Sequence, residues 1–335
     1  MVEAMNDMGE LRWEAPSLDA IREAQGRTAG AVVRTPLVRL DWAEAPAAPS
    51  GMELYLKLEL LQPVRSFKLR GAYNAMAAAG PDALAGGVWT ASAGNMAQAV
   101  AWSARALGVA ATVYVPDTAP RAKVNNVKGY GGRVVELPVS EWIDIFRTRR
   151  REGATGLFIH PYSDPLVLAG NAVCGLEIAE DLPDVSAVIA PFGGGGLSAG
   201  IAAALRHVAP GAKVYGSEID TGAPLAPSLA AGAPVEVAYA PSFADGIGSP
   251  FVNSEMFTLA HELGMGAIVV SREQTAEAAR VIMRRAGLIP EGAAATTLAA
   301  ALTGEAGTGK VVCVMSGANV DPDVVREILA GGTPG

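Results

Sequence analysis

Short apolar runs alternate along the chain with longer, alanine-rich segments in which apolar residues recur at helical spacing. The short runs are rich in Val, Ile and Tyr and predict buried strands, whereas the longer segments predict helices with one apolar face. The expected strands are 53–58, 87–90, 112–115, 133–137, 187–190, 213–216, 267–270 and 310–315. The clearest expected helices are 66–79, 95–107, 166–180, 197–208, 272–286 and 292–302. This alternation predicts an α/β protein with open, mostly parallel sheets flanked by helices.

The length of 335 residues favours two lobes over one, because a single core stops growing at about 250–300 residues. A cleft between the lobes is then expected. The segment 221–248 contains four prolines and few periodic positions, and it predicts an irregular excursion that ends in a turn at Asp245-Gly246 and borders the cleft. The most apolar stretch, 185–205, is interrupted by Pro191 and four glycines, which predicts a strand, a loop and a helix instead of a membrane span.

Composition and charge exclude several classes of protein. The formal charge of −8 comes from 34 acidic and 26 basic residues, and no basic block suggests a nucleic-acid partner. The two cysteines, Cys174 and Cys313, lie in apolar surroundings and predict neither a disulfide framework nor structural zinc. The first residues lack a secretory pattern. We therefore expect a cytoplasmic protein without a membrane or nucleic-acid partner.

A glycine-rich segment at 188–200 combines a strand, a loop and a helix start, an arrangement that can bind an anion on backbone N–H groups. A tight turn without a ligand is the simplest interpretation. A dinucleotide-binding site is a second interpretation, because Gly194, Gly196 and Ala199 match G-x-G-x-x-A. Glu218 follows at the position where a carboxylate would bind the ribose. A hydrolase is a third, because Ser198 lies in G-x-S-x-G with His261 downstream, although this short pattern often arises by chance.

A phosphorylated cofactor attached elsewhere in the chain is a fourth interpretation, which three further segments favour. The segment 66–73 opens a helix with Lys68 beside an aromatic ring, and a lysine can form a Schiff base when burial lowers its pKa. The segment 90–98 is a strand-to-helix loop of small polar residues suited to a carboxylate. The segment 315–319 follows another buried strand in the same manner.

Taken in this order, the segments resemble the fold-type II pyridoxal 5'-phosphate (PLP) enzymes, specifically the threonine dehydratase and serine racemase family. The resemblance extends over about 21–329, and the segment 59–73 is most similar to the biosynthetic threonine deaminases. Feedback control by a C-terminal regulatory domain of the kind those enzymes carry is not expected. The resemblance implies the tryptophan synthase β-like fold, with a flexible segment at 1–16, a large PLP-binding domain at 17–86 plus 166–330, and a small substrate-loop domain at 87–165. It also implies a homodimer.

The resemblance assigns expected roles to individual residues. Lys68 would be the catalytic, cofactor-bearing lysine, Phe67 would pack against the cofactor ring, Asn95 would bind its 3'-oxygen, and Ser316 would face the pyridine nitrogen. The expected phosphate cradle is Gly193, Gly194, Gly195, Gly196 and Leu197. The expected substrate-binding residues, around the substrate carboxylate, are Ser92, Ala93, Gly94, Asn95 and Met96. The blocks 160–165 and 291–295 would also line the site.

The activity that the resemblance implies is an ammonia-lyase reaction on a small β-hydroxy amino acid. Lys68 would remove the α-proton as a general base, and L-threonine or L-serine would yield 2-oxobutanoate or pyruvate with ammonia. β-Replacement and racemisation remain alternatives, although the racemases carry a serine at the position of Ala93. Other departures are Met96 and the segments 170–173 and 316–319, which would reshape the pocket. No metal site is expected, because Gly222 and Pro224 offer no side-chain oxygen beside Glu218.

Overall fold

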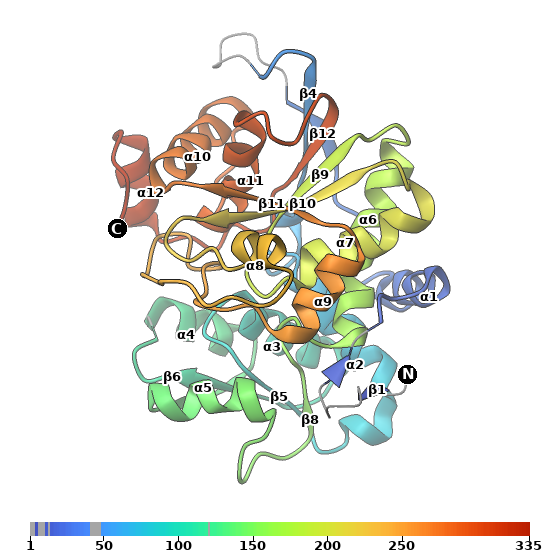
Figure 1. Ribbon diagram of the computed structural model, residues 1–335. Coiled ribbons are helices and arrows are strands. Elements are labelled where there is room, and N and C mark those ends of the chain that lie inside the picture. The colour runs from blue at the N-terminus through green and yellow to red at the C-terminus, as the bar shows by residue number, and fades with distance from the viewer. Residues whose placement is uncertain (1–3, 6–10, 13, 41–47, 120) are drawn as a thin grey trace.

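The computed structural model describes residues 4–5, 11–12, 14–40, 48–119 and 121–335. Two open sheets, each flanked by helices, lie one above the other in Figure 1. The fold is therefore α/β with two mostly parallel sheets, as predicted from the sequence. The predicted flexible segment 1–16 lies largely outside the described residues. Its described parts include the short antiparallel strands β1 (Ala4–Met5) and β2 (Leu11–Arg12).

The larger sheet has six strands in the order β11-β10-β9-β12-β4-β3, parallel except for β3. Its strands are β3 (Leu37–Arg39), β4 (Met52–Lys57), β9 (Ala187–Pro191), β10 (Lys213–Ile219), β11 (Gly266–Val270) and β12 (Gly309–Val314). Central strand β12 alternates its side chains between two apolar clusters. Val311 and Cys313 join one cluster, whereas Val312 and Val314 join the other. Both faces of this sheet are therefore buried under helices.

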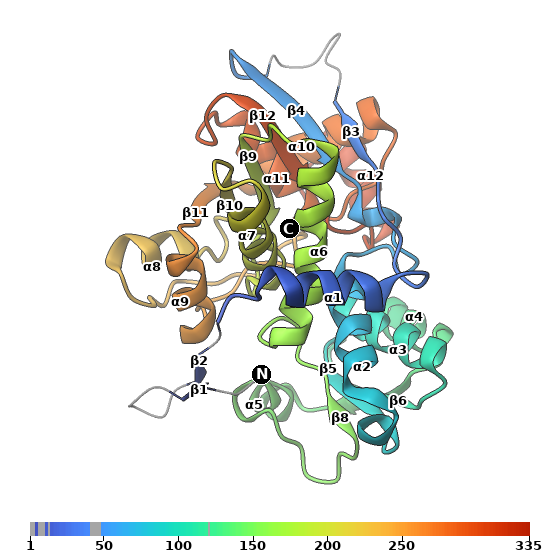
Figure 2. The same ribbon diagram turned by 90° about the vertical axis from the view of Figure 1, so that its right-hand side faces the viewer.

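The first cluster is covered by α10 (Arg272–Ala286), α11 (Gly292–Leu302) and α12 (Pro322–Leu329). The second is covered by α6 (Pro165–Asp181), α7 (Gly196–Val208) and α9 (Ser254–Glu262). Helices α1 (Leu18–Thr28) and α8 (Leu225–Ala231) lie further out, and a 3₁₀ turn spans Glu59–Leu61. Figure 2 shows α1 crossing in front of α6.

The smaller sheet has four parallel strands in the order β7-β6-β5-β8. Its strands are β5 (Val88–Ala91), β6 (Ala111–Pro116), β7 (Arg133–Leu137) and β8 (Leu157–Phe158), and its helices are α3 (Asn95–Leu107), α4 (Arg121–Gly129) and α5 (Val139–Thr148). Helix α2 (Lys68–Leu84) packs on both α3 and α6, so it connects the two lobes. The domain boundaries at 86–87 and 165–166 stay a prediction, although β5 to β8 fall between them.

The predicted strands and helices are all present, and the bounds of β7, α3, α10 and α11 are as expected. Helix α2 continues to Leu84, but Gly80 has a φ of +77° and interrupts it after Ala79, where the predicted helix ended. The prediction for 221–248 was partly wrong because α8 forms within it. No described helix is long and apolar enough to cross a membrane, and the 185–205 stretch forms β9, a loop and the start of α7.

Candidate active site

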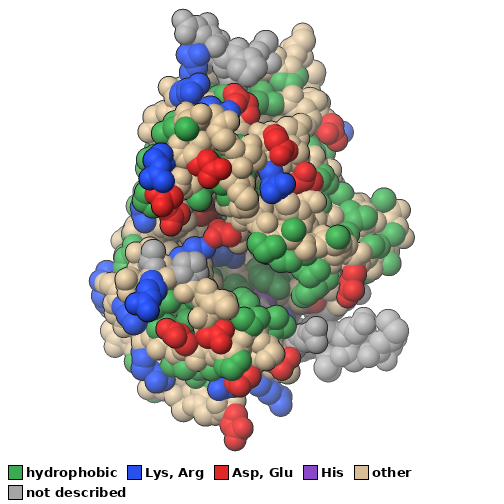
Figure 3. Space-filling view, turned by 90° about the vertical axis from the view of Figure 1, so that its left-hand side faces the viewer, with side chains coloured by type: hydrophobic (Ala, Val, Ile, Leu, Met, Phe, Trp, Pro, Cys, Tyr) green, Lys and Arg blue, Asp and Glu red, His purple; other side chains and the backbone are tan. Residues whose placement is uncertain are grey.

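A pocket of about 690 Å³ opens between the two sheets. Its walls include the carboxyl ends of β5 and β9, where parallel sheets commonly bind ligands. Figure 3 shows the face of the molecule that is hollowed between the lobes. Each residue proposed from the sequence as cofactor- or substrate-binding lines this pocket.

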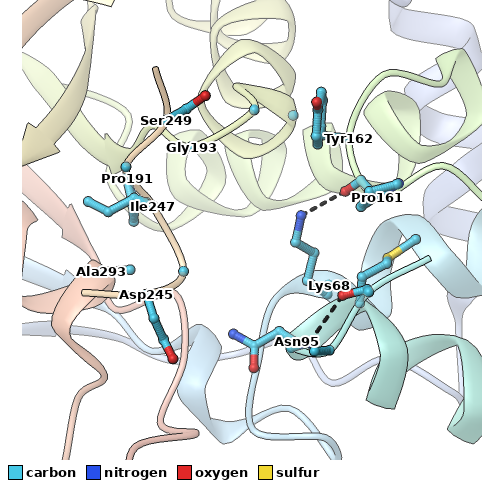
Figure 4. A pocket seen from close by; sticks show the side chains of 18 of the residues that line it. Lys68, Asn95, Pro161, Tyr162, Pro191, Gly193, Asp245, Ile247, Ser249 and Ala293 are labelled. Carbon is cyan, nitrogen blue, oxygen red and sulfur yellow. Dashed lines mark hydrogen bonds between the residues drawn. The ribbon is translucent and has the colours of Figure 1, made fainter. Parts of the chain in front are cut away.

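Lys68 begins α2 and extends its side chain into the pocket (Figure 4). Its Nζ donates a hydrogen bond to the Pro161 carbonyl oxygen at 2.7 Å and lies 5.0 Å from the centroid of the Phe67 ring. Burial lowers the pKa of Lys68 to about 8, against the opposing effect of the Glu291 carboxylate. A substantial fraction of this amine is therefore neutral near physiological pH, which is the form that acts as nucleophile or base.

The glycine loop joins β9 to α7 on the opposite wall. Gly195 adopts a left-handed φ of +83°, and a Cβ on Gly194 would lie 2.3 Å from ring atoms of Tyr162. The Tyr162 hydroxyl donates to Asn253 Oδ1 at 3.0 Å, which holds the ring against the loop. A Cβ on Gly193 would lie 3.1 Å from the Gly246 carbonyl oxygen. The loop is therefore bare backbone at a helix N-terminus, as an anion cradle requires.

The loop between β5 and α3 forms a second wall of small residues. Ser92 Oγ accepts a hydrogen bond from the Gly94 N–H at 3.2 Å, and α3 begins at Asn95. Met96 is only 1% exposed and packs in the apolar cluster that contains Leu69 and Ile159. Its side chain therefore contributes to the core beneath the loop.

Asn95 is held by buried Glu291 and half-buried Asn319. Its Nδ2 donates to both carboxylate oxygens of Glu291, at 3.0 and 2.9 Å, and its Oδ1 accepts from Asn319 Nδ2 at 2.8 Å. Burial raises the pKa of Glu291 to about 7 despite the hydrogen bond from Asn95. A Cβ on Gly317 would lie 2.5 Å from Glu291 Oε1, so this carboxylate fits only against a glycine. The side chains that flank Asn95 thus fix how its amide is oriented.

Ser316 contributes a buried polar group to the pocket wall. The residue is 1% exposed, and among the described residues its Oγ has no hydrogen-bond partner. A buried hydroxyl without a partner is costly, so a ligand atom that hydrogen-bonds it would stabilise this wall. A lysine amine, an anion cradle and a lone buried hydroxyl in one pocket fit PLP, which carries an aldehyde, a phosphate and a ring nitrogen.

The competing interpretations of the glycine loop lose support. Ser198 is fully buried and its hydroxyl donates to the Gly195 carbonyl oxygen at 3.2 Å, whereas His261 is exposed on α9. Both oxygens of Glu218 accept backbone N–H groups, from Leu225 at 2.8 Å and Ala226 at 2.9 Å, so this carboxylate is not free for a ribose. The expected lack of a metal site beside Glu218 stays a prediction.

Two charged residues of the pocket were not predicted. Lys123 on α4 forms an ion pair with Asp245 at the pocket, and the segment that carries Asp245 was expected only to border a cleft. The sequence 121–129 is too polar to mark a helix, so nothing placed Lys123 there. Tyr162, Glu291 and Asn319 lay in segments that had been singled out, without individual roles.

Comparison with known proteins agrees with this geometry. The family model for pyridoxal-phosphate dependent enzymes matches residues 28–317. An L-threonine ammonia-lyase of Geobacter sulfurreducens is 39% identical over 318 residues, which cover 93% of this chain and 78% of that protein. The crystal structure of serine racemase from Dictyostelium discoideum is similar with a TM-score of 0.82 at 31% identity, over 92% of this chain and 100% of that one.

The processed form of threonine deaminase isoform 2 from Solanum lycopersicum is similar with a TM-score of 0.80 at 31% identity, over 95% of this chain and 95% of that one. These matches confirm the resemblance, the fold and the cofactor that the sequence predicted. The chain belongs to the family of pyridoxal-phosphate dependent enzymes.

Proposed function

We propose that this enzyme is a PLP-dependent ammonia-lyase that converts a small β-hydroxy amino acid, L-threonine or L-serine, to a 2-oxo acid and ammonia. The observation that carries the proposal is the position of the Lys68 amine, between the glycine loop at 193–196 and the small-residue loop at 92–95. The names of the threonine ammonia-lyase and threonine deaminase relatives support the same reaction class.

The residues present fit the cofactor at three places. Lys68 would hold its aldehyde carbon, the N–H groups of the glycine loop and Leu197 would hold its phosphate, and Ser316 would face its ring nitrogen. Phe67 and Asn95 would contact the ring and its 3'-oxygen. Bound PLP supplies an electron sink that weakens the bonds at the α-carbon of an attached amino acid. A serine hydroxyl cannot protonate the ring nitrogen fully, which favours elimination over reactions that need a stronger sink.

The chain's own groups would then orient the substrate and move its proton. The loop of Ser92, Ala93, Gly94 and Asn95 would hold the substrate carboxylate at the N-terminus of α3, and Met96 would support that loop from the core. The Lys68 amine would take the α-proton, and its low pKa keeps part of it neutral for this task. The reaction removes water across the Cα–Cβ bond and later adds water to release ammonia, so it balances without an oxidant.

The test is release of 2-oxo acid from L-threonine, L-serine and a panel of larger β-hydroxy amino acids. We expect product from the wild-type enzyme, and a decrease of roughly 10³-fold or more in Lys68→Ala, because both attachment and proton transfer lose their group. Lys128→Ala, the same change at an exposed lysine of α4, is the matched control and should retain activity.

Absence of product from the whole panel would overturn the lyase assignment. Racemised or β-substituted product in its place would support the alternative reactions of this fold.

We further propose that the enzyme is a cytoplasmic homodimer. Family resemblance supports the dimer, and the two buried thiols, Cys174 and Cys313, support a reducing compartment. Light scattering of the holoenzyme in solution tests the dimer.

A further inference from the structure

The pocket carries ionisable side chains at two depths. Lys68 and Glu291 lie inside and have assigned tasks, whereas Lys123 and Asp245 form an ion pair whose side chains remain 28% and 53% exposed. Lys123 comes from α4 beside the smaller sheet, and Asp245 comes from the irregular segment beside the larger sheet. The pair therefore joins the two lobes at the rim of the pocket.

Figure 4 places Asp245 across the pocket from Pro161 and Tyr162. At one end of the hollow in Figure 3, acidic and basic side chains lie beside each other. The pair is close enough to the inner pocket to influence Glu291, whose pKa is raised by Asp245 and lowered by Lys123. A charged group on a substrate side chain would therefore experience both members of the pair.

We propose that Asp245 makes the enzyme select amino acids with uncharged side chains, by neutralising Lys123 at the rim of the pocket. This inference rests on the proposed function, in which the substrate's α-carboxylate lies at the 92–95 loop. A second carboxylate that reached Lys123 would also meet Asp245, so attraction and repulsion nearly cancel. Without the Asp245 charge, only the attraction to Lys123 would remain, and an acidic side chain would be favoured.

The test compares kcat/KM for an acidic substrate, 3-hydroxyaspartate, with kcat/KM for L-threonine. Asp245→Asn keeps the shape of the side chain and removes its charge, and we expect the acidic-to-neutral ratio to rise roughly tenfold or more at low salt. Lys123→Gln should lower the ratio, because it leaves Asp245 unpaired. The double variant should return the ratio close to that of the wild type.

Two further readouts distinguish charge selection from a structural effect. The gain in Asp245→Asn should shrink as salt rises from about 0.01 to 0.15 M, because exposed charges are screened. The matched control is Asp184→Asn, which removes the acidic partner of another 28% exposed lysine, Lys310, outside the residues that line the pocket. It should leave the ratio as it is in the wild type.

A binding experiment keeps the inference separate from the lyase assignment. L-Aspartate and L-alanine lack a β-hydroxyl, and their binding to the holoenzyme is followed by the visible absorption of the cofactor. Asp245→Asn should strengthen binding of aspartate relative to alanine by roughly tenfold. If no panel member yields product and this shift still occurs, the lyase assignment fails and the charge selection stands. An unchanged ratio in both experiments, or an equal change in Asp184→Asn, overturns the inference.

Discussion

The Lys68 amine lies against a carbonyl oxygen, with no carboxylate among its hydrogen-bond partners in the described structure. A carbonyl accepts the hydrogen bond without contributing a full negative charge, so burial outweighs the attraction to Glu291 and the pKa falls to about 8. An exposed lysine would remain almost entirely protonated at neutral pH. The local environment of this one side chain therefore sets the pH range in which it can react.

We predict that the rate at which PLP attaches to the apoenzyme rises with pH through a midpoint of about 8, because the neutral amine is the reactive form. Stopped-flow absorption between about pH 6 and 10 measures it. Glu291→Gln should move the midpoint lower, since it removes the negative charge that favours the ammonium form of Lys68. A midpoint near 10.5, or an upward shift in the variant, would contradict this account.

Gly317 is a second residue whose effect is local and measurable. In Gly317→Ala the new Cβ would lie 2.5 Å from Glu291 Oε1, so the carboxylate must leave its hydrogen bonds with Asn95. Asn95 would then no longer be oriented to hydrogen-bond the 3'-oxygen of PLP. Because a hydrogen bond to a charged group contributes about 1.5–3 kcal/mol, we expect the Kd for PLP to rise roughly ten- to hundredfold. Titration of apoenzyme by absorbance measures it. Ala318→Gly, at the adjacent position, is the control, and equal affinities in both variants would refute the prediction.

One helix that the sequence predicted well carries its own start and stop signals. Helix α10 begins with a capping box between Ser271 and Gln274, and its bounds were predicted correctly. Helix α4 was missed because its sequence has a polar character. Its apolar residues, Val124 and Val127, join the buried cluster to which Ala97 of α3 belongs, so tertiary contacts determine this helix. Short strands such as β8, with two residues, leave no readable alternation.

A buried network of charges was equally beyond prediction, because its members are far apart in the sequence. Arg70 donates to Glu59 at 2.7 Å and to Glu177 at 2.7 and 2.8 Å, and Lys57 donates to Glu177 at 2.6 Å. These side chains, no more than 5% exposed, connect β4, the 3₁₀ turn, α2 and α6. Since Arg70 lies two residues after Lys68, the network fixes the start of the helix that carries the reactive amine.

We predict that Glu177→Gln lowers the free energy of unfolding by about 3–5 kcal/mol, because it leaves two buried cations short of a compensating charge. Chemical and thermal unfolding, followed by circular dichroism, measure the loss. Asp323→Asn, in an ion pair with Arg326 whose side chains are 75% and 78% exposed, should leave stability almost unchanged. Similar losses of stability in both variants would mean that burial of the charged network does not determine its contribution to the free energy of unfolding.

At the scale of the whole molecule, the sequence predicted two lobes and the loops that meet between them, but not which side chains face one another across the pocket. Lys68, the glycine loop and Ser316 lie in segments that were singled out because each follows a recognisable strand or opens a helix, and the family resemblance gave them their expected roles. Lys123 and Asp245 meet only because the two lobes, each built on its own sheet, lie against each other in this arrangement. Such a pair depends on the placement of entire lobes, which local patterns do not encode.

The cofactor should in turn stabilise the arrangement of the lobes, because residues from both sides of the pocket would contact it. A ligand present at about 1,000 times its Kd stabilises the native state by about 4 kcal/mol, so the holoenzyme should unfold at a higher temperature than the apoenzyme. Scanning calorimetry measures the two midpoints. Pyridoxal, which lacks the phosphate, should give a smaller increase because the glycine loop gains no anion.

Lys68→Ala separates attachment from phosphate binding. With excess PLP this variant should still gain stability over its own apo form, through the glycine loop and Ser316, but less than the wild type gains. If pyridoxal stabilised the wild type as strongly as PLP, the loop at 193–196 would not be the phosphate site. If PLP had no effect on the stability of Lys68→Ala, attachment to the lysine would account for all of the stabilisation. The glycine loop would then position the phosphate without adding to the stability of the enzyme.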